Sequence, residues 1–392
     1  MFRGLTLRVP HRPFLVRIDA LMNVCGRGRA ADKTCSHMRR IRLYVHVILL
    51  TAMAGGGCAR SEYYYRGANY EIQIEKGAVL RSISLGAATE DEILALVPER
   101  VSEREIRDVL SRGPAPRIVI LDGTLPIVTM ESFSEFLIDM GYPEEKIRKP
   151  NGGGYSYNGF TDSKRLAGTL AWYYEKEGMM PILIGHSQGG MLAIKVLHEL
   201  AGAFHDNIPV WNPLTNEAEE RGAIVDPITG QTRAVIGLQV RYAAAITTGK
   251  VMRIVLGQWD MLPRLREIPD TVEEFTGFSL AWDLIAGNFG AAARYRPLGS
   301  ARVRNVTLPG EYTHITVPLT KHLAANEVTR EWIDRYVPTS EMPEFPTNVD
   351  VDTQNILHAA DIWYHVKKYW CVEAQQLIRA RRDMMGGRDF GS

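Results

Sequence analysis

A serine flanked by glycines, Ser187, is the residue of this sequence with the clearest chemical potential. It lies in the stretch GHSQG, residues 185–189, directly between an apolar run and a helical pattern. A G-x-S-x-G turn at such a junction needs glycines where side chains would collide, and it projects the hydroxyl toward the positive end of the following helix. A serine held in this way can act as a nucleophile that forms a covalent intermediate, provided that a base removes its proton.

The elements around Ser187 are expected to hold it at the edge of a buried sheet. Apolar runs predict strands at residues 117–121, 181–185, 238–249 and 302–310. Amphipathic patterns with caps predict helices at residues 130–143, 161–178, 188–202 and 325–337. Strands that are apolar throughout and alternate with helices indicate an α/β fold, with a mostly parallel central sheet covered by helices on both faces.

Two stretches do not fit this alternation and are interpreted as insertions. Residues 205–235 are polar and rich in turn signals, which predicts hairpin-like structure. Residues 251–300 mix prolines with large apolar side chains and are expected to form a cap. The aromatic residues there either line an acyl pocket or pack as cap and core; they are Trp259, Phe275, Phe278, Trp282 and Phe289.

The form GHSQGG, residues 185–190, between strand and helix resembles the α/β-hydrolase superfamily, especially its lipase, esterase and thioesterase branches. The resemblance spans residues 80–337. It implies a chain order of serine, acid and histidine, with the histidine after the last strand. His314, in TLPGEYTHITVP, has that place, and His322 is the alternative base nearer the closing helix.

The carboxylate that orients the base is expected after the penultimate strand of this family. Asp283 ends the apolar run EFTGFSLAWD, residues 274–283, and the sequence DLIAG resembles the acid loop of the family. Asp260, in VLGQWDMLP, is the alternative acid. Either aspartate could instead be an ordinary turn or cap residue.

Acyl transfer also needs donors for the oxyanion of the tetrahedral intermediate. The resemblance implies the backbone N–H of Gln188 as one donor and an N–H from the loop after residues 117–121 as the other. That loop reads DGTLP, residues 122–126, where the family commonly has His-Gly, and Thr124 is the expected donor. No cofactor is required, and no Cys/His cluster suggests a metal site.

Charge is distributed unevenly along the chain. Ten of the 46 Lys and Arg but only two of the 45 Asp and Glu precede Cys58, which leaves 36 basic and 43 acidic residues after it. An acidic folded part argues against nucleic acid as a partner. The basic segment before Cys58 therefore needs another explanation.

Residues 39–58 resemble a bacterial lipoprotein signal. A basic pair is followed by the short apolar run 43–53, too short for a membrane span, and then by small residues ending at Cys58. We expect residues 1–57 to be a leader and signal peptide, with translation starting at Met38, and Cys58 to be lipidated. The mature protein would then be exported and anchored in the bacterial cell envelope, with Cys371 as its one free thiol.

The remaining parts of the chain flank the expected hydrolase domain. Residues 58–79 are interpreted as a short linker or strand, and residues 338–392 as a linker followed by a C-terminal helix. The helix carries an apolar stripe at helical spacing, which favours docking on the main domain over a membrane-surface or partner helix. The stripe consists of Ile356, Ala359, Trp363, Val366, Trp370, Ala374 and Leu377.

The combined interpretation is a serine hydrolase that cleaves a carboxylic ester, lipase-like or esterase-like, through an acyl-enzyme on Ser187. The substrate would be a small-molecule or lipid ester with an apolar acyl group. An acyltransferase or a thioesterase on the same residues is the alternative within enzymes, and a serine peptidase is a further one. A catalytically inactive hydrolase fold that serves as an envelope binding protein is the alternative of another class.

Overall fold

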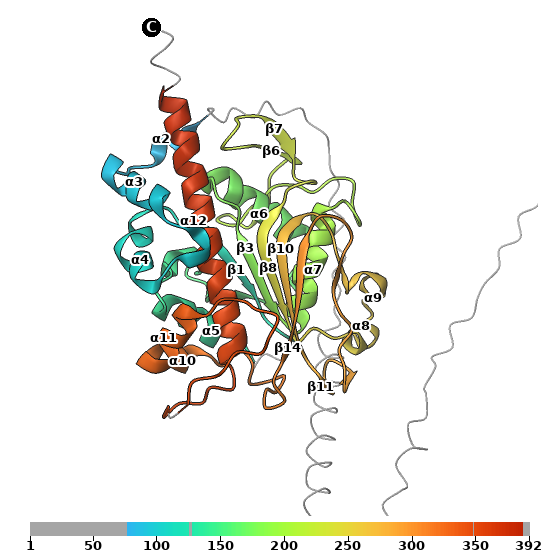
Figure 1. The fold of residues 1–392 in the computed structure, drawn as a ribbon. Coiled ribbons are helices and arrows are strands. Elements are labelled where there is room, and N and C mark those ends of the chain that lie inside the picture. The colour runs from blue at the N-terminus through green and yellow to red at the C-terminus, as the bar shows by residue number, and fades with distance from the viewer. Residues whose placement is uncertain (1–76, 125–127, 348, 387–392) are drawn as a thin grey trace, which may run out of the picture. The chain divides into compact units, whose positions relative to one another are not determined.

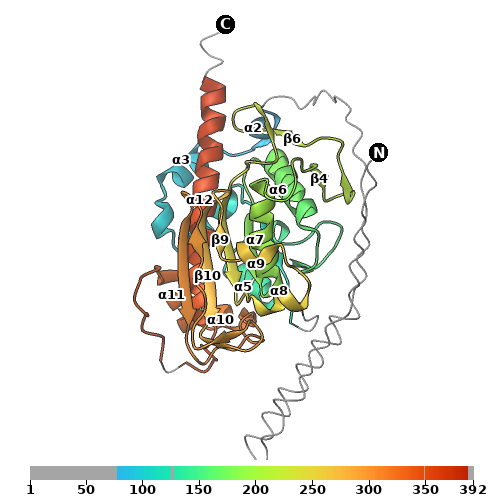
Figure 2. The same cartoon turned by 90° about the vertical axis from the view of Figure 1, so that its right-hand side faces the viewer.

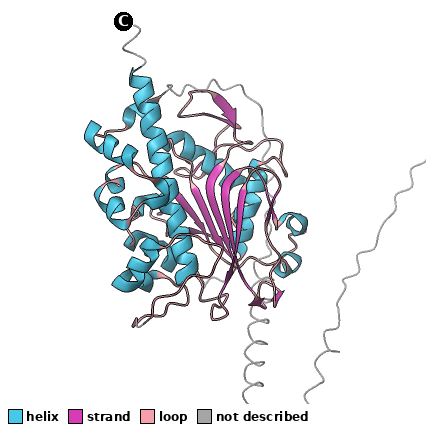
Figure 3. Ribbon diagram, viewed as in Figure 1, coloured by secondary structure: helices cyan, strands magenta, loops and turns pink. Residues whose placement is uncertain are grey.

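The computed structural model describes residues 77–124, 128–347 and 349–386. The expected signal peptide and Cys58 lie outside these residues. The described chain has α/β architecture, with a central sheet between two layers of helices (Figures 1 and 3). Among the described residues, no helix is both long enough and apolar enough to span a membrane.

The central sheet has six strands, and every neighbouring pair is parallel. In spatial order they are β2 (Ser156–Tyr157), β1 (Ile118–Leu121), β3 (Ile182–His186), β8 (Val240–Ile246), β10 (Val272–Leu280) and β14 (Arg302–Leu308). Because the strands are parallel, the loops that follow them meet at one edge of the sheet. That edge carries Ser187, directly after β3.

Both faces of the sheet are buried. Along β1, Ile118 and Ile120 belong to one apolar core, whereas Val119 and Leu121 belong to the other. This alternation follows from the two-residue period of a strand. Each face therefore needs its own layer of helices, as the two views show (Figures 1 and 2).

The first core lies under α5 (Glu131–Asp139), α10 (Lys321–Ala325), α11 (Glu327–Arg335) and α12 (Ile356–Gly386). Shorter elements flank this layer: α2 (Ala78–Ser82), α3 (Ala87–Ala95), α4 (Glu103–Asp108) and the 3₁₀ turns at Pro98–Arg100, Leu110–Arg112 and Glu144–Lys146. The second core lies under α6 (Ser163–Glu177) and α7 (Gln188–Leu200). Beside it are α8 (Val251–Val255) and α9 (Met261–Arg264).

Local sequence signals set the ends of the helix before the nucleophile strand. The Asp162 carboxylate accepts the backbone N–H of Arg165 at 2.7 Å and caps the start of α6. Gly178 ends the helix with φ 75°, a left-handed conformation that glycine adopts without a steric penalty. The helices and strands expected on either side of Ser187 are thus present close to their expected bounds.

The two expected insertions have different outcomes. Residues 205–235 contain two hairpins, β4 (Trp211–Asn212) with β5 (Glu217–Ala218) and β6 (Ala223–Val225) with β7 (Thr232–Ala234). Residues 251–300, in contrast, contain β10, a strand of the central sheet. Only the flanks of β10 form small additions, the pairs β9 (Glu267–Ile268) with β13 (Arg296–Pro297) and β11 (Trp282–Asp283) with β12 (Asn288–Phe289).

Two short elements differ from what the sequence indicates. The glycine-rich stretch 151–160, in which no strand was expected, contains the edge strand β2. Residues 78 and 79, assigned to a linker or strand, open the helix α2. The cause in both cases is length, because elements of two to five residues carry too little periodicity to be distinguished from loops.

The C-terminal helix α12 is part of the main core rather than an appended segment. All seven residues of its apolar stripe are buried. Trp370 packs edge-on against Tyr142 with ring centroids 4.9 Å apart, and its indole N–H donates to the Pro114 carbonyl at 2.9 Å. The boundary expected after residue 337 therefore does not divide the packed structure.

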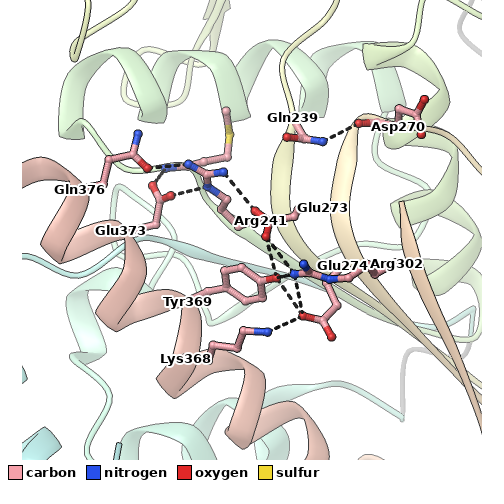
Figure 4. A network of polar contacts seen from close by, with 11 residues as sticks. Gln239, Arg241, Asp270, Glu273, Glu274, Arg302, Lys368, Tyr369, Glu373 and Gln376 are labelled. Carbon is pink, nitrogen blue, oxygen red and sulfur yellow. Dashed lines mark hydrogen bonds and ion pairs between the residues drawn. The ribbon is translucent and has the colours of Figure 1, made fainter. Parts of the chain in front are cut away.

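Charged side chains join α12 to the amino-terminal ends of the central strands (Figure 4). Arg241 of β8 donates to Glu373 at 2.7 Å and to Gln376 at 2.6 Å. Glu274 of β10 accepts from Lys368 at 2.8 Å and from the Tyr369 hydroxyl at 2.9 Å. These groups lie at the edge of the sheet opposite Ser187. One edge therefore attaches α12 to the sheet, and the other carries Ser187.

A buried histidine of α12 makes the stability depend on pH. His358 lies among the rings of Phe133, Phe278 and Tyr312, and burial lowers its pKa from 6.5 to about 3. Below pH 6.5 the unfolded chain binds a proton that the folded chain does not, so stability falls as the pH falls toward 3. We expect this histidine to lower the free energy of unfolding by about 2 kcal/mol between pH 7.5 and pH 5.

Urea unfolding at the two pH values would measure this loss. In His358→Phe the decrease in the free energy of unfolding should be smaller than in the wild type by about 2 kcal/mol. An equal decrease in both proteins would contradict the assignment.

Candidate active site

Ser187 occupies a strained turn between β3 and α7. Its φ of 54° and ψ of −110° place a non-glycine residue in a region that is rarely populated. The surrounding structure holds it there, since its N–H donates to the Ile246 carbonyl at 2.8 Å and its carbonyl accepts the Thr248 hydroxyl at 3.0 Å. The strained backbone therefore directs the serine side chain.

The glycines on both sides of Ser187 allow close backbone approach. A Cβ on Gly185 would lie 2.2 Å from the Gly189 carbonyl oxygen, and one on Gly189 would lie 2.2 Å from the Leu121 carbonyl oxygen. At both positions any side chain would clash with the neighbouring backbone. The glycine pattern of the sequence is thus a steric requirement of this turn.

His314 and Asp283 lie in line with the serine hydroxyl. The Nε2 atom of His314 is 2.9 Å from Ser187 Oγ, and its Nδ1 atom is 2.7 Å from Asp283 Oδ2. All three side chains are buried. The expected residues are therefore brought together from three separate loops, after β3, after β10 and after β14.

The carboxylate of Asp283 is fixed on both of its oxygens. Asp283 lies in the hairpin formed by β11 and β12, where its Oδ1 atom accepts the N–H of Ala286 at 2.9 Å. The other oxygen is then left to accept the Nδ1–H of His314. This leaves Nε2 unprotonated and facing the serine hydroxyl, as a general base requires.

The alternative acid, Asp260, and the alternative base, His322, contact groups outside the line from Ser187 to Asp283. Asp260 accepts from Lys195 at 2.8 Å and is 41% exposed. His322 is 2.7 Å from the Asp352 carbonyl oxygen, on the exposed side of α10. Of the two aspartates considered, Asp283 is the one hydrogen-bonded to His314.

The expected oxyanion donors lie near Ser187. Gln188 is the first residue of α7 and is buried, so its backbone N–H lies at the positive end of the helix. In the DGT loop, a Cβ on Gly123 would lie 3.4 Å from Ser187 Cβ. Thr124 directly follows Gly123 and is half-buried.

Asp122 lies at the position where α/β-hydrolases commonly have histidine. In this structure its side chain holds the loop after β1 in place. Its carboxylate accepts the Met130 N–H at 2.7 Å and the Ser156 hydroxyl at 2.8 Å. Burial raises its pKa, although these hydrogen bonds act in the opposite direction. Asp122 thus ties the loop after β1 to the edge strand β2.

His186, the variable residue of the G-x-S-x-G pattern, supports His314. Its Nε2 lies 2.9 Å from the His314 carbonyl oxygen, which requires a proton on that nitrogen. Burial and the neighbouring His314 hold the pKa of His186 well below its ordinary value, so the ring is neutral. The sequence analysis did not predict this role. The only signal in the sequence was the position of His186 next to Ser187, which does not reveal a contact with His314.

Arg253 of α8 is a second neighbour that the sequence did not indicate. Its buried guanidinium donates to the side-chain oxygens of Gln188 and Gln258. Burial lowers its pKa to about 10. No ion pair links it to a carboxylate of the described residues, so it places a positive charge beside the residue that follows Ser187.

The aromatic residues of the expected cap fall into a buried group and an exposed group. Phe275 and Phe278 are core residues of β10, one on each face of the sheet. Trp259, Trp282 and Phe289 are exposed. In the part of the chain that the structure describes, no group of three or more His, Cys, Asp or Glu side chains is placed to hold a metal ion.

Comparisons with models of protein families, with curated proteins and with solved structures find no match to this chain. The structure defines the chain as an α/β protein with a six-stranded parallel sheet. Any more specific assignment depends on the chemistry of the site.

Proposed function

We propose that the protein is a serine hydrolase of the α/β-hydrolase superfamily that cleaves a carboxylic ester. The observation that carries this proposal is the hydrogen-bonded line from Ser187 Oγ through His314 to Asp283, with distances of 2.9 and 2.7 Å. The strained turn after the third strand in chain order and the parallel sheet support the same superfamily.

In the first half-reaction, Ser187 Oγ attacks the ester carbonyl carbon while His314 Nε2 takes the hydroxyl proton. The tetrahedral intermediate places its oxyanion at the N–H groups of Gln188 and Thr124, and the positive end of α7 stabilises the same charge. The intermediate expels the alcohol, which receives the proton from His314. An acyl group then remains as an ester on Ser187.

The second half-reaction repeats these steps with water. His314 takes a proton from the water molecule, whose oxygen attacks the acyl carbonyl, and the proton returns to Ser187 Oγ as the carboxylic acid leaves. Asp283 stabilises the imidazolium that forms in each step. An alcohol or amine that replaced water would give the acyltransferase alternative with the same residues.

A fluorophosphonate probe tests the proposal, because it phosphonylates only an activated serine. We expect labelling of the full chain and none of Ser187→Ala. Ser279→Ala, which removes a half-buried serine of β10, is the matched control and should label like the wild type. Absence of labelling in the folded wild type would leave a binding protein as the better explanation. Labelling that persists in Ser187→Ala would assign the nucleophile to another residue.

A further inference from the structure

A group of large apolar side chains is exposed beside the candidate active site. We name it the apolar rim, and its members are Val251, Ile254, Val255, Trp259, Trp282, Leu284 and Phe289. Its three aromatic residues are far from buried, with Trp282 73%, Phe289 68% and Trp259 61% exposed. Single exposed apolar residues are common on proteins, whereas a group of this kind marks an interaction surface.

The rim is made of two neighbouring segments. A Cβ on Gly287, in the β11–β12 hairpin, would lie 2.2 Å from Val251 Cγ2 at the start of α8. A Cβ on Gly249 would lie 1.9 Å from the Ala286 carbonyl oxygen. The hairpin and α8 are therefore in contact, and both lie near the carboxyl ends of the strands (Figure 1).

The rim adjoins the site itself. Asp283 is a buried residue of the hairpin, and its two sequence neighbours, Trp282 and Leu284, are exposed as rim residues. At the other segment, α8 begins three residues after Thr248, whose hydroxyl bonds to the Ser187 carbonyl. An apolar phase that covered the rim would lie next to the nucleophile.

The charges beside the rim indicate which apolar phase it fits. Lys250 directly precedes α8, and Arg294 follows β12 by five residues; both are exposed, and neither has an ion pair with another described residue. The acidic neighbour Asp260 is paired with Lys195. Exposed tryptophan and phenylalanine with adjacent free cations match the boundary between lipid acyl chains and anionic headgroups.

We infer that the apolar rim docks on an anionic lipid surface and that the enzyme takes its ester from that surface. The choice of a lipid ester as substrate rests on the proposed function, whereas the docking itself does not. Because α8 and the hairpin already expose these side chains, docking requires no prior opening of the structure.

Tryptophan quenching by brominated lipid tests the docking directly. All seven tryptophans lie in the described part of the chain, and Trp259 and Trp282 are the exposed ones that the rim contributes. The full chain would carry Cys58→Ala, so that no lipid anchor forms, and Ser187→Ala, so that no lipid is consumed. Vesicles would contain phosphatidylglycerol and phosphatidylcholine brominated on its acyl chains.

We expect the emission of this protein to be quenched, and the quenching to be lost when Trp259→Phe and Trp282→Phe are combined. Ile254→Glu with Val255→Glu should also abolish it, because carboxylates resist insertion beside anionic headgroups. The matched control places glutamate at Val97 and Leu214, which are similarly exposed on other elements, and should be quenched like the parent.

Absence of quenching in the parent would overturn the inference. So would quenching that persists without the two rim tryptophans. A dimer in sedimentation velocity that Ile254→Glu with Val255→Glu dissociates, without any quenching, would instead assign the rim to contact between two copies. Since catalysis is switched off in every sample, these outcomes are independent of the fluorophosphonate result.

Discussion

Replacement of Asp283 by asparagine is expected to lower kcat for an ester substrate by about 10⁴-fold while the protein stays folded. The Ala286 N–H and the His314 Nδ1–H both point at this carboxylate. An asparagine has one carbonyl oxygen for these two donors, so its NH₂ group must face one of them. If it faces His314, the imidazole takes the tautomer with a proton on Nε2, which cannot accept the serine proton.

Asp260→Asn is the matched control, because Asp260 was the other acid that the sequence allowed. Its carboxylate pairs with Lys195 at an exposed site and does not contact His314, so kcat should change by less than about threefold. Initial rates on a soluble p-nitrophenyl ester would provide both values. A large decrease in Asp260→Asn with a small one in Asp283→Asn would reverse the assignment of the acid.

The largest expected effect on stability comes from Trp370→Ala, which should cost about 3–5 kcal/mol of unfolding free energy. The substitution leaves a cavity against Tyr142 and removes the donor to the Pro114 carbonyl. Both losses occur in the core between α12 and the sheet, where the surrounding helices limit collapse into the space.

Urea unfolding followed by circular dichroism would measure this cost. Trp259→Ala, at a tryptophan that is mostly exposed, should change the unfolding free energy by about 0.5 kcal/mol or less. A loss below about 1 kcal/mol in Trp370→Ala would contradict the integral position of α12.

Much of the fold around Ser187 could be predicted because its signals are local. The strand before the serine is apolar throughout, the helix after it has a clear apolar face, and Asp162 and Gly178 mark the preceding helix. Such patterns depend on a few neighbouring residues. They do not depend on how distant parts of the chain pack.

The strand β10 was hidden for the opposite reason. Its sequence includes most of the apolar run that ends at Asp283, but prolines and large apolar residues are scattered through 251–300, so this whole range was interpreted as an insertion. Pairing with β8 and β14 places Val272–Leu280 in the central sheet.

Within the site, the sequence favoured Asp283 as the acid but left Asp260 as an alternative, because the choice depends on which loop reaches His314. The contributions of His186 and Arg253 are likewise contacts between distant segments. Chain order identified the candidates for the serine and its base. Tertiary structure was needed for the hydrogen bonds that connect them to their surroundings.

The place of α12 has a consequence for the timing of folding during synthesis. One face of the sheet lacks one of its covering helices until residues 356–386 have been made, since Trp363, Trp370 and their neighbours come from this last described helix. Domains generally fold as units. The core on that face is therefore completed only when almost all of the described sequence has left the ribosome.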